Sequence, residues 1–180
     1  MNCNDYKCAS CDALPDISFS ICAPSVSNGQ ITDLFISKQG HPFIDVEDAD
    51  EWASRVVLSG NIPGALLNLK GIGSKAVPTQ NTSTGAFGVS QYSNKTHQFA
   101  FKIHEVNESN YSLIRYFEKF PKATCWYGTG GGKCFGGNSG MDCEVVFNSI
   151  IPENILEVET VEGTITFTSA LHPCRSNSMI

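Results

Sequence analysis

The feature that most constrains the fold is a change of hydrophobic period near the middle of the chain. Residues 97–104 alternate between two faces, which is the period-two pattern of a strand with one buried side. Residues 107–120 then carry large apolar side chains at helical spacing, between a candidate cap at Asn107 and the helix-ending Pro121. Alternation returns over residues 143–147. This order of strand, helix and strand predicts one helix lying against a sheet.

The rest of the chain predicts more strands and one further helix. Residues 31–37 form the first expected strand, and residues 65–69 and 86–92 form two more. A second helix is expected to begin at Asp48, with Glu51 in the position of a capping box, and to end near residues 59–60. The predicted fold class is therefore mainly β, a β-barrel or an orthogonal sandwich, with one or two flanking α-helices.

Several connections are expected to be irregular. Long loops are predicted over residues 71–84 and 128–140, where Gly is frequent, and a turn is predicted over residues 93–95. Leu156 and Val158 lie on one strand phase, whereas Val161, Ile165 and Phe167 lie on the other. A straight strand cannot bury both sets, so a β-bulge or corner is expected within residues 159–162.

The predicted organisation is an N-terminal arm over residues 1–23, a single β-rich domain over residues 24–170, and a C-terminal tail over residues 171–180. The length of 180 residues and the 41% hydrophobic content are typical of one domain with a real core. A net charge of −6 argues against a protein that coats nucleic acid. We find no apolar run of spanning length and no secretory signal pattern, and expect no membrane span and synthesis in the cytoplasm.

Eight cysteines leave three chemical states open. Cys8 and Cys11 have the C-x-x-C spacing of a zinc half-site, which would need Cys3, Cys22, or distant residues such as His172 and Cys174 to complete it. The alternatives to structural zinc are disulfides formed after release from the cell and free or buried thiols. No other cofactor is expected.

No catalytic motif has the required spacing. The glycine-rich segment 128–134 differs from a phosphate-binding loop, with Cys134 in the place of the final Ser or Thr. Residues 137–141 lack the last glycine of a nucleophile elbow. A nucleophilic Cys125 or Cys134 with a histidine base remains as a third-ranked alternative. The sequence favours a protein that is not an enzyme.

Several short segments resemble virion structural proteins of tailed bacteriophages that infect Bacteroidota, including crAss-like phages. They are residues 31–37 followed by Pro42, residues 48–55 with Trp52, the glycines of residues 135–140, and residues 165–167 ahead of Pro173. The order of strand, helix and strand is also similar to tail-tube and related ring-forming folds, in which a β-barrel carries a flanking helix. The resemblance implies a virion protein that acts by self-assembly and docking to other virion proteins, with DNA passing by and no specific nucleic-acid binding.

The expected contact residues are drawn from the glycine-rich segment and from the acidic C-terminal part. They are Trp126, Tyr127, Phe135, Glu157, Glu159 and Glu162, with Glu153 as a further acidic residue that could line a lumen. Residues 1–23 and 171–180 are candidate latches between subunits. The main alternative is a glycan- or host-surface-binding module, in which Trp126 and Tyr127 form an exposed patch beside a mobile loop.

Overall fold

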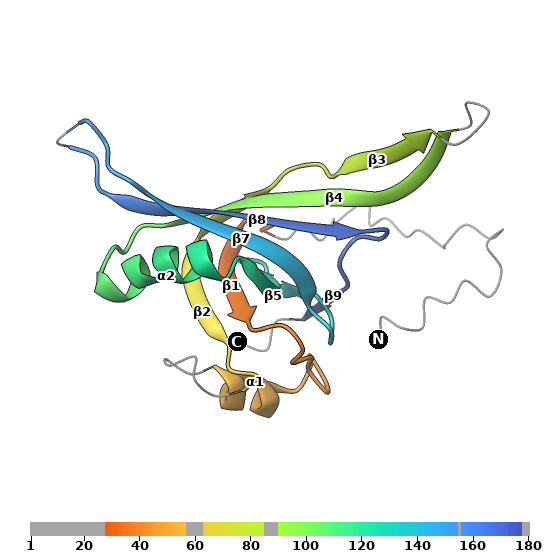
Figure 1. The fold of residues 1–180 in the computed structure, drawn as a ribbon. Coiled ribbons are helices and arrows are strands. Elements are labelled where there is room, and N and C mark those ends of the chain that lie inside the picture. Colours follow the sequence, from red (N-terminus) through yellow and green to blue (C-terminus); the bar gives the residue numbers. More distant parts are fainter. Residues whose placement is uncertain (1–27, 57–62, 85–89, 155, 178–180) are drawn as a thin grey trace, which may run out of the picture.

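The computed structural model describes residues 28–56, 63–84, 90–154 and 156–177, and shows a closed six-stranded antiparallel barrel with additional strands and two helices (Figure 1). The barrel order is β1–β2–β4–β8–β7–β5, and pairing of β5 with β1 closes it. The elements are β1 (Ile31–Ser37), α1 (Ala49–Arg55), β2 (Leu67–Lys75), β3 (Thr79–Thr84), β4 (Ser90–Ile103), α2 (Glu108–Lys119), β5 (Lys122–Thr129), β6 (Lys133–Phe135), β7 (Met141–Ile150), β8 (Thr160–Ser169) and β9 (Arg175–Asn177). The predicted mainly-β class and the barrel alternative are confirmed.

Side chains fill the barrel interior, because large aromatic residues lie opposite glycines. A Cβ at Gly163 would be 2.3 Å from the Phe147 ring, and a Cβ at Gly71 would be 2.9 Å from the Phe101 ring. Gly73 likewise leaves space for Phe101. Small barrels commonly alternate small and large interior residues in this way. The interior is therefore a packed core.

The two helices cover different surfaces of the barrel. Helix α2 packs on β7 and completes the interior core with Ile114 and Phe117, whose ring centroid is 5.6 Å from that of Phe147. Helix α1 covers the outside of β1 and β5, where Trp52 packs in a second core with Phe35 and other residues. Strand β5 is buried on both faces, which explains its continuous run of buried residues.

Two ribbons extend from the barrel on opposite sides (Figure 1). One is the β7–β8 hairpin, which pairs in regular register from Cys143 opposite Phe167 to Ile150 opposite Thr160. The other is formed by β3 and the first half of β4, because β3 pairs only with β4. Both ribbons reach beyond the strands that close the barrel.

Two of the predicted loops are wrong in large part. Residues 71–84 contain the second half of β2 and all of β3, because Gly71 and Gly73 are strand positions that accommodate Phe101. The segment 128–140 contains the end of β5 and all of β6, and Gly136 and Gly140 pack against Trp126. Close packing, rather than chain flexibility, accounts for the glycines at these positions.

Other boundaries also differ from those predicted. The expected turn at residues 93–95 is wrong, because β4 continues through it while paired with β3. The β-bulge or corner expected within residues 159–162 is wrong as well: β8 begins at Thr160 and pairs with β7 without a register shift, and the preceding residues form the connection from β7.

Helix α1 ends at Arg55 instead of near residues 59–60, because Val56 leaves the helix and forms a bridge with Leu66. The predicted strand 86–92 lies partly outside the described residues, and its last residues, from Ser90, belong to β4. Within the predicted C-terminal tail, residues 171–180, Arg175–Asn177 form β9, which pairs with β6.

Candidate assembly surfaces

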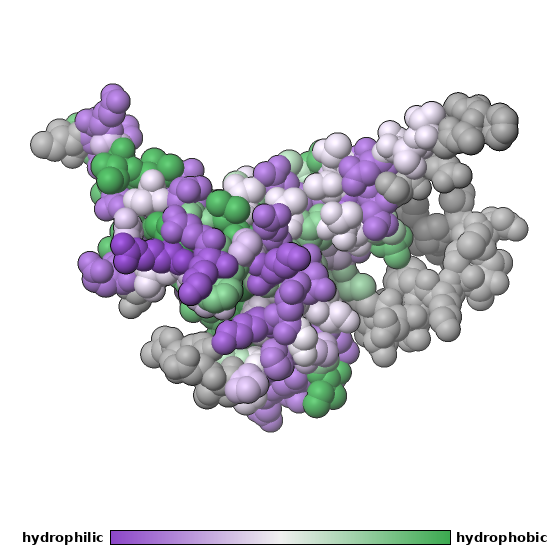
Figure 2. Space-filling view, viewed as in Figure 1, coloured by the Kyte–Doolittle hydropathy of each residue, from purple (hydrophilic) through white to green (hydrophobic). Residues whose placement is uncertain are grey.

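Ile150, the last residue of β7, and the described residues of the β7–β8 connection, 151–154 and 156–159, form a surface that we call the hairpin tip. Exposed apolar residues gather there: Ile150, Ile151, Leu156 and Val158 are 43%, 79%, 88% and 69% exposed. Glu153 and Glu157 are exposed beside them, and neither side chain has a hydrogen bond or ion pair with another described residue. Figure 2 shows hydrophobic and hydrophilic residues side by side on this hairpin. Such an unpartnered apolar protrusion is typical of an interaction surface.

At the opposite end of the barrel, basic side chains take the place of the acidic ones of the hairpin tip. We call this surface the basic mouth. It consists of the aromatic residues Tyr127, Phe135 and Phe167 together with the basic residues Lys75, His97 and His172. The His97 ring stacks on Phe167 at 4.7 Å, and His172 lies edge-on to His97 at 5.6 Å. Lys75 Nζ is 5.8 Å from the Phe167 ring centroid.

The bases of the mouth lack an anionic partner within the described part of the chain. His97 is completely buried, and its ring nitrogens have no side-chain hydrogen-bond partner there; the backbone of Ser169 lies near the ring without forming a well-aligned hydrogen bond. Burial lowers the pKa of His97, and the positive charges of Lys75 and His172 lower it further. Burial also lowers the pKa of Lys75. Three basic groups thus converge without a described carboxylate to neutralise them.

Two exposed apolar residues are close in sequence to basic residues of the mouth. Val77 follows Lys75 in the β2–β3 connection and is 90% exposed, and Leu171 precedes His172 and is 71% exposed. The sequence analysis missed this site, because Lys75 and His172 are about one hundred residues apart and share no motif. The only signal was His97 at a position that strand alternation predicts to be buried.

Helix α2 carries a further exposed aromatic surface. Tyr111, Tyr116 and Phe120 are 45%, 42% and 51% exposed, and the last two rings are 5.4 Å apart. The sequence predicted that Tyr111 and Phe120 would face the sheet with Ile114 and Phe117. Only the latter two are buried, because the helix contacts the barrel along a narrow stripe.

The predicted contact residues of the glycine-rich segment lie within the fold. Trp126 is completely buried, and its Nε1 donates a hydrogen bond to the Gly137 carbonyl at 2.7 Å. Tyr127 is 4% exposed and stacks on the half-buried Phe135 at 4.8 Å. A Cβ at Gly136 would be 2.5 Å from the Trp126 ring. The expected exposed patch of Trp126 and Tyr127 is therefore wrong, since both side chains are core residues.

The predicted acidic residues have different environments. Glu157 is exposed on the hairpin tip, whereas Glu159 accepts a hydrogen bond from the Ser149 hydroxyl at 2.6 Å. Glu162 forms a 2.9 Å ion pair with Lys102 on the outside of the barrel. Of these three residues, only Glu157 has a carboxylate without a described partner.

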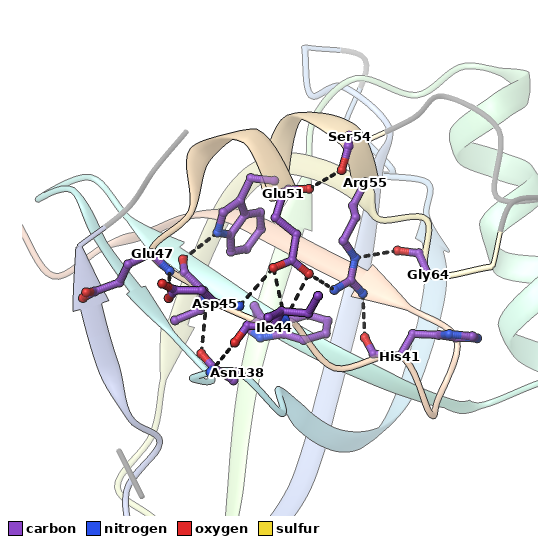
Figure 3. Close-up of polar contacts among 12 residues, drawn as sticks. His41, Ile44, Asp45, Glu47, Glu51, Ser54, Arg55, Gly64 and Asn138 are labelled. Atoms are coloured by element: carbon purple, nitrogen blue, oxygen red, sulfur yellow. Dashed lines mark hydrogen bonds and ion pairs between the residues drawn. The ribbon is translucent and has the colours of Figure 1, made fainter. Parts of the chain in front are cut away.

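The acidic segment formed by α1 and the loop before it, residues 44–55, which we call the α1 segment, has a structural role (Figure 3). The Glu51 carboxylate accepts hydrogen bonds from the backbone amides of Ile44 and Asp45 and lies 3.5 Å from Arg55. Asn138 links this segment to the glycine-rich loop by accepting from the Val46 amide and donating to the Ile44 carbonyl. Asp48 caps α1 as predicted, but Glu51 binds the preceding loop instead of completing a capping box.

Arg55 joins the other side of the same cluster. Its guanidinium donates to the carbonyls of Gly64 and His41 at 2.8 and 2.6 Å. It also lies over the Phe43 ring, 4.1 Å from the centroid, which is a favourable cation–π geometry. These contacts account for the polar residues of this region without a ligand.

The described cysteines have the surroundings of core residues. Cys125, Cys134 and Cys143 are free and buried, and Cys174 is disulfide-bonded. Burial raises the pKa of Cys125 and raises that of Cys134 to about 12, the opposite of the shift that activates a nucleophile. No group of three or more metal-ligating side chains occurs within the described residues, and the zinc candidates Cys3, Cys8, Cys11 and Cys22 lie outside them.

Comparisons with known proteins give no family assignment: no family model and no curated protein matches this chain. Among the helices of the described residues, neither α1 nor α2 is long and apolar enough to cross a membrane.

Proposed function

We propose that this chain is a structural component of a phage virion, a tail tube or ring subunit or a capsid-associated protein. It acts by self-assembly and by docking to neighbouring virion proteins. In this role it is made in the host cytoplasm and becomes part of the particle, and DNA passes it without specific binding.

The observation that carries the proposal is the position of two unlike surfaces at opposite ends of a filled barrel. The hairpin tip is apolar and acidic, and the basic mouth is aromatic and cationic. Two different surfaces on opposite sides of one subunit favour head-to-tail contacts, which generate rings or filaments according to whether the rotation closes. The resemblance to ring-forming virion proteins is consistent with this arrangement.

Helix α2 supports the second part of the proposal, docking to other virion proteins. Tyr111 and Tyr116 of this helix, and Phe120 directly after it, are exposed and belong neither to the hairpin tip nor to the mouth. Aromatic side chains are enriched in protein interfaces. This surface is therefore suited to a neighbour other than the next copy of the chain.

The test is the solution mass of the purified protein, measured by light scattering over a concentration series with and without reductant. Self-assembly predicts a discrete mass well above 19.5 kDa, or a mass that grows with concentration. A constant mass of one chain over the whole series contradicts self-assembly. A mass that falls on reduction identifies disulfides as part of the assembly.

A further inference from the structure

The hairpin tip and the basic mouth are complementary in both charge and polarity. The tip presents the carboxylates of Glu153 and Glu157 among exposed apolar side chains. The mouth contains three basic groups without a described anionic partner, and the exposed Val77 and Leu171 adjoin two of them in the chain. A carboxylate brought to the mouth would pair with the positive charge of its basic groups. The apolar residues of the tip would at the same time pack against Val77 and Leu171.

The positions of the two surfaces exclude contact between them within one chain. Strand β8 begins at the hairpin tip with Thr160 and reaches the mouth at Phe167. At about 3.3 Å per residue, these two positions are roughly 23 Å apart along the strand. The carboxylates of the tip can therefore reach a mouth only in another copy of the chain.

We propose that the hairpin tip of one copy docks against the basic mouth of a second copy, with Glu153 and Glu157 facing Lys75 and the exposed His172, next to the buried His97. The inference rests on the proposed self-assembly and identifies its interface. Each chain then offers one tip and one mouth, so the contact repeats from copy to copy in one direction. The exposed apolar side chains of the tip are buried in each contact.

The docking makes association depend on pH in a defined direction. Burial is the largest influence on the His97 pKa and lowers it; the basic groups that face it, Lys75 of β2, His172 after β8 and Lys95 of β4, lower it further, and the backbone of Ser169 opposes this only in part. The undocked fold therefore holds the His97 pKa below its unfolded value of 6.5, and its free energy of unfolding falls as the pH drops through 6.5. A docked carboxylate favours the imidazolium form and raises the His97 pKa. Acidification from pH 7.5 to 6 is thus expected to destabilise the monomer but to strengthen association.

His97→Gln tests this pH dependence. The variant is expected to lose most of the difference in association between pH 7.5 and 6, measured by light scattering at both values. Wild-type association that weakens on acidification contradicts the docking of carboxylates at this site. If His97→Gln keeps the full difference in association between pH 7.5 and 6, the docking is contradicted as well.

A mixing experiment tests the interface itself. Lys75→Met weakens the mouth but leaves the tip intact, whereas the double variant Glu153→Gln/Glu157→Gln weakens the tip but leaves the mouth intact. Each variant alone is expected to associate at least 10-fold more weakly than the wild type. An equimolar mixture is expected to form a one-to-one complex, because one intact tip can meet one intact mouth.

The outcomes separate this inference from the proposed function. If the wild type assembles but both variants do so equally well, or their mixture stays monomeric, the interface is wrong and self-assembly stands. If the wild type is monomeric throughout, the proposed function fails, and a peptide of residues 149–160 tests the docking separately. The peptide is expected to raise the His97 pKa, measured by NMR, in the wild type and not in Lys75→Met. A His97 pKa that does not respond to the peptide overturns the docking.

Discussion

The α1 segment and the hairpin tip have similar compositions but opposite environments. Each combines carboxylates with exposed apolar side chains, represented by Ile44 at 90% exposure in one and Leu156 at 88% in the other. In the α1 segment, backbone amides and Arg55 bind the carboxylate of Glu51, whereas Glu157 on the tip has no described partner. The donors around an acidic residue, and not the acidic composition, decide whether it serves the fold or is free for another molecule.

The largest effect on stability is expected for the aromatic centre of the α1 segment, compared with an exposed aromatic residue outside both regions. Trp52 is 1% exposed, packs against Phe35 and Phe43, and donates from Nε1 to the Val46 carbonyl at 2.7 Å. Trp52→Ala should lower the free energy of unfolding by about 3–5 kcal/mol in chemical denaturation, since it leaves a cavity. The same replacement at the half-exposed Phe120 should cost less than about 1 kcal/mol. Equal losses would show that α1 is not held by a buried core.

A smaller effect is expected from the matched glutamates. Glu51→Ala removes an acceptor for two backbone amides and should cost about 1–2 kcal/mol, with some reduction because the side chain is 17% exposed. Glu157→Ala should change the free energy of unfolding of the monomer by less than about 0.5 kcal/mol. Urea unfolding in dilute solution measures both. A destabilising Glu157→Ala would mean that the tip carboxylate already has a structural role.

The smallest effect is expected from two caps with the same local geometry. The side chains of Asp48 and Asn154 each accept a hydrogen bond from the backbone amide two residues later. Asp48→Ala removes a helix N-cap and should lower the free energy of unfolding by about 1 kcal/mol. Asn154→Ala affects only an exposed turn, so a loss below about 0.5 kcal/mol is expected. Thermal unfolding of both variants provides the comparison, and the reverse order of effects would contradict it.

The sequence predicted the elements that depend on local periodicity. Strand β1 has its predicted bounds, and α2 ends within one residue of the prediction, because alternation and helical spacing report directly on a buried face. The glycines of β2 were assigned to a loop. Their role depends on the Phe101 ring, which comes from a strand thirty residues later, and no local pattern contains that information.

The candidate site was only partly predictable for the same reason. Glu157 was identified from charge and position, and the structure places it on an exposed tip. Trp126 was expected to be a contact residue beside the glycine-rich segment, but Gly136 and Gly140 of that segment pack against its ring. The basic mouth needs the register of three strands, β2, β4 and β8, to bring Lys75, His97 and His172 together, so it could not be recognised before the fold was known.

The measurement that tests the account most directly is the association of two matched serine variants, followed by light scattering over a concentration series. Ile151→Ser/Leu156→Ser alters the hairpin tip, and Ile44→Ser alters an equally exposed apolar residue of the α1 segment. We predict that the tip variant stays at the mass of one chain while the α1 variant assembles as the wild type does. Equal association of both variants, or loss of association only in Ile44→Ser, would contradict the claim that the chain assembles through its hairpin tip.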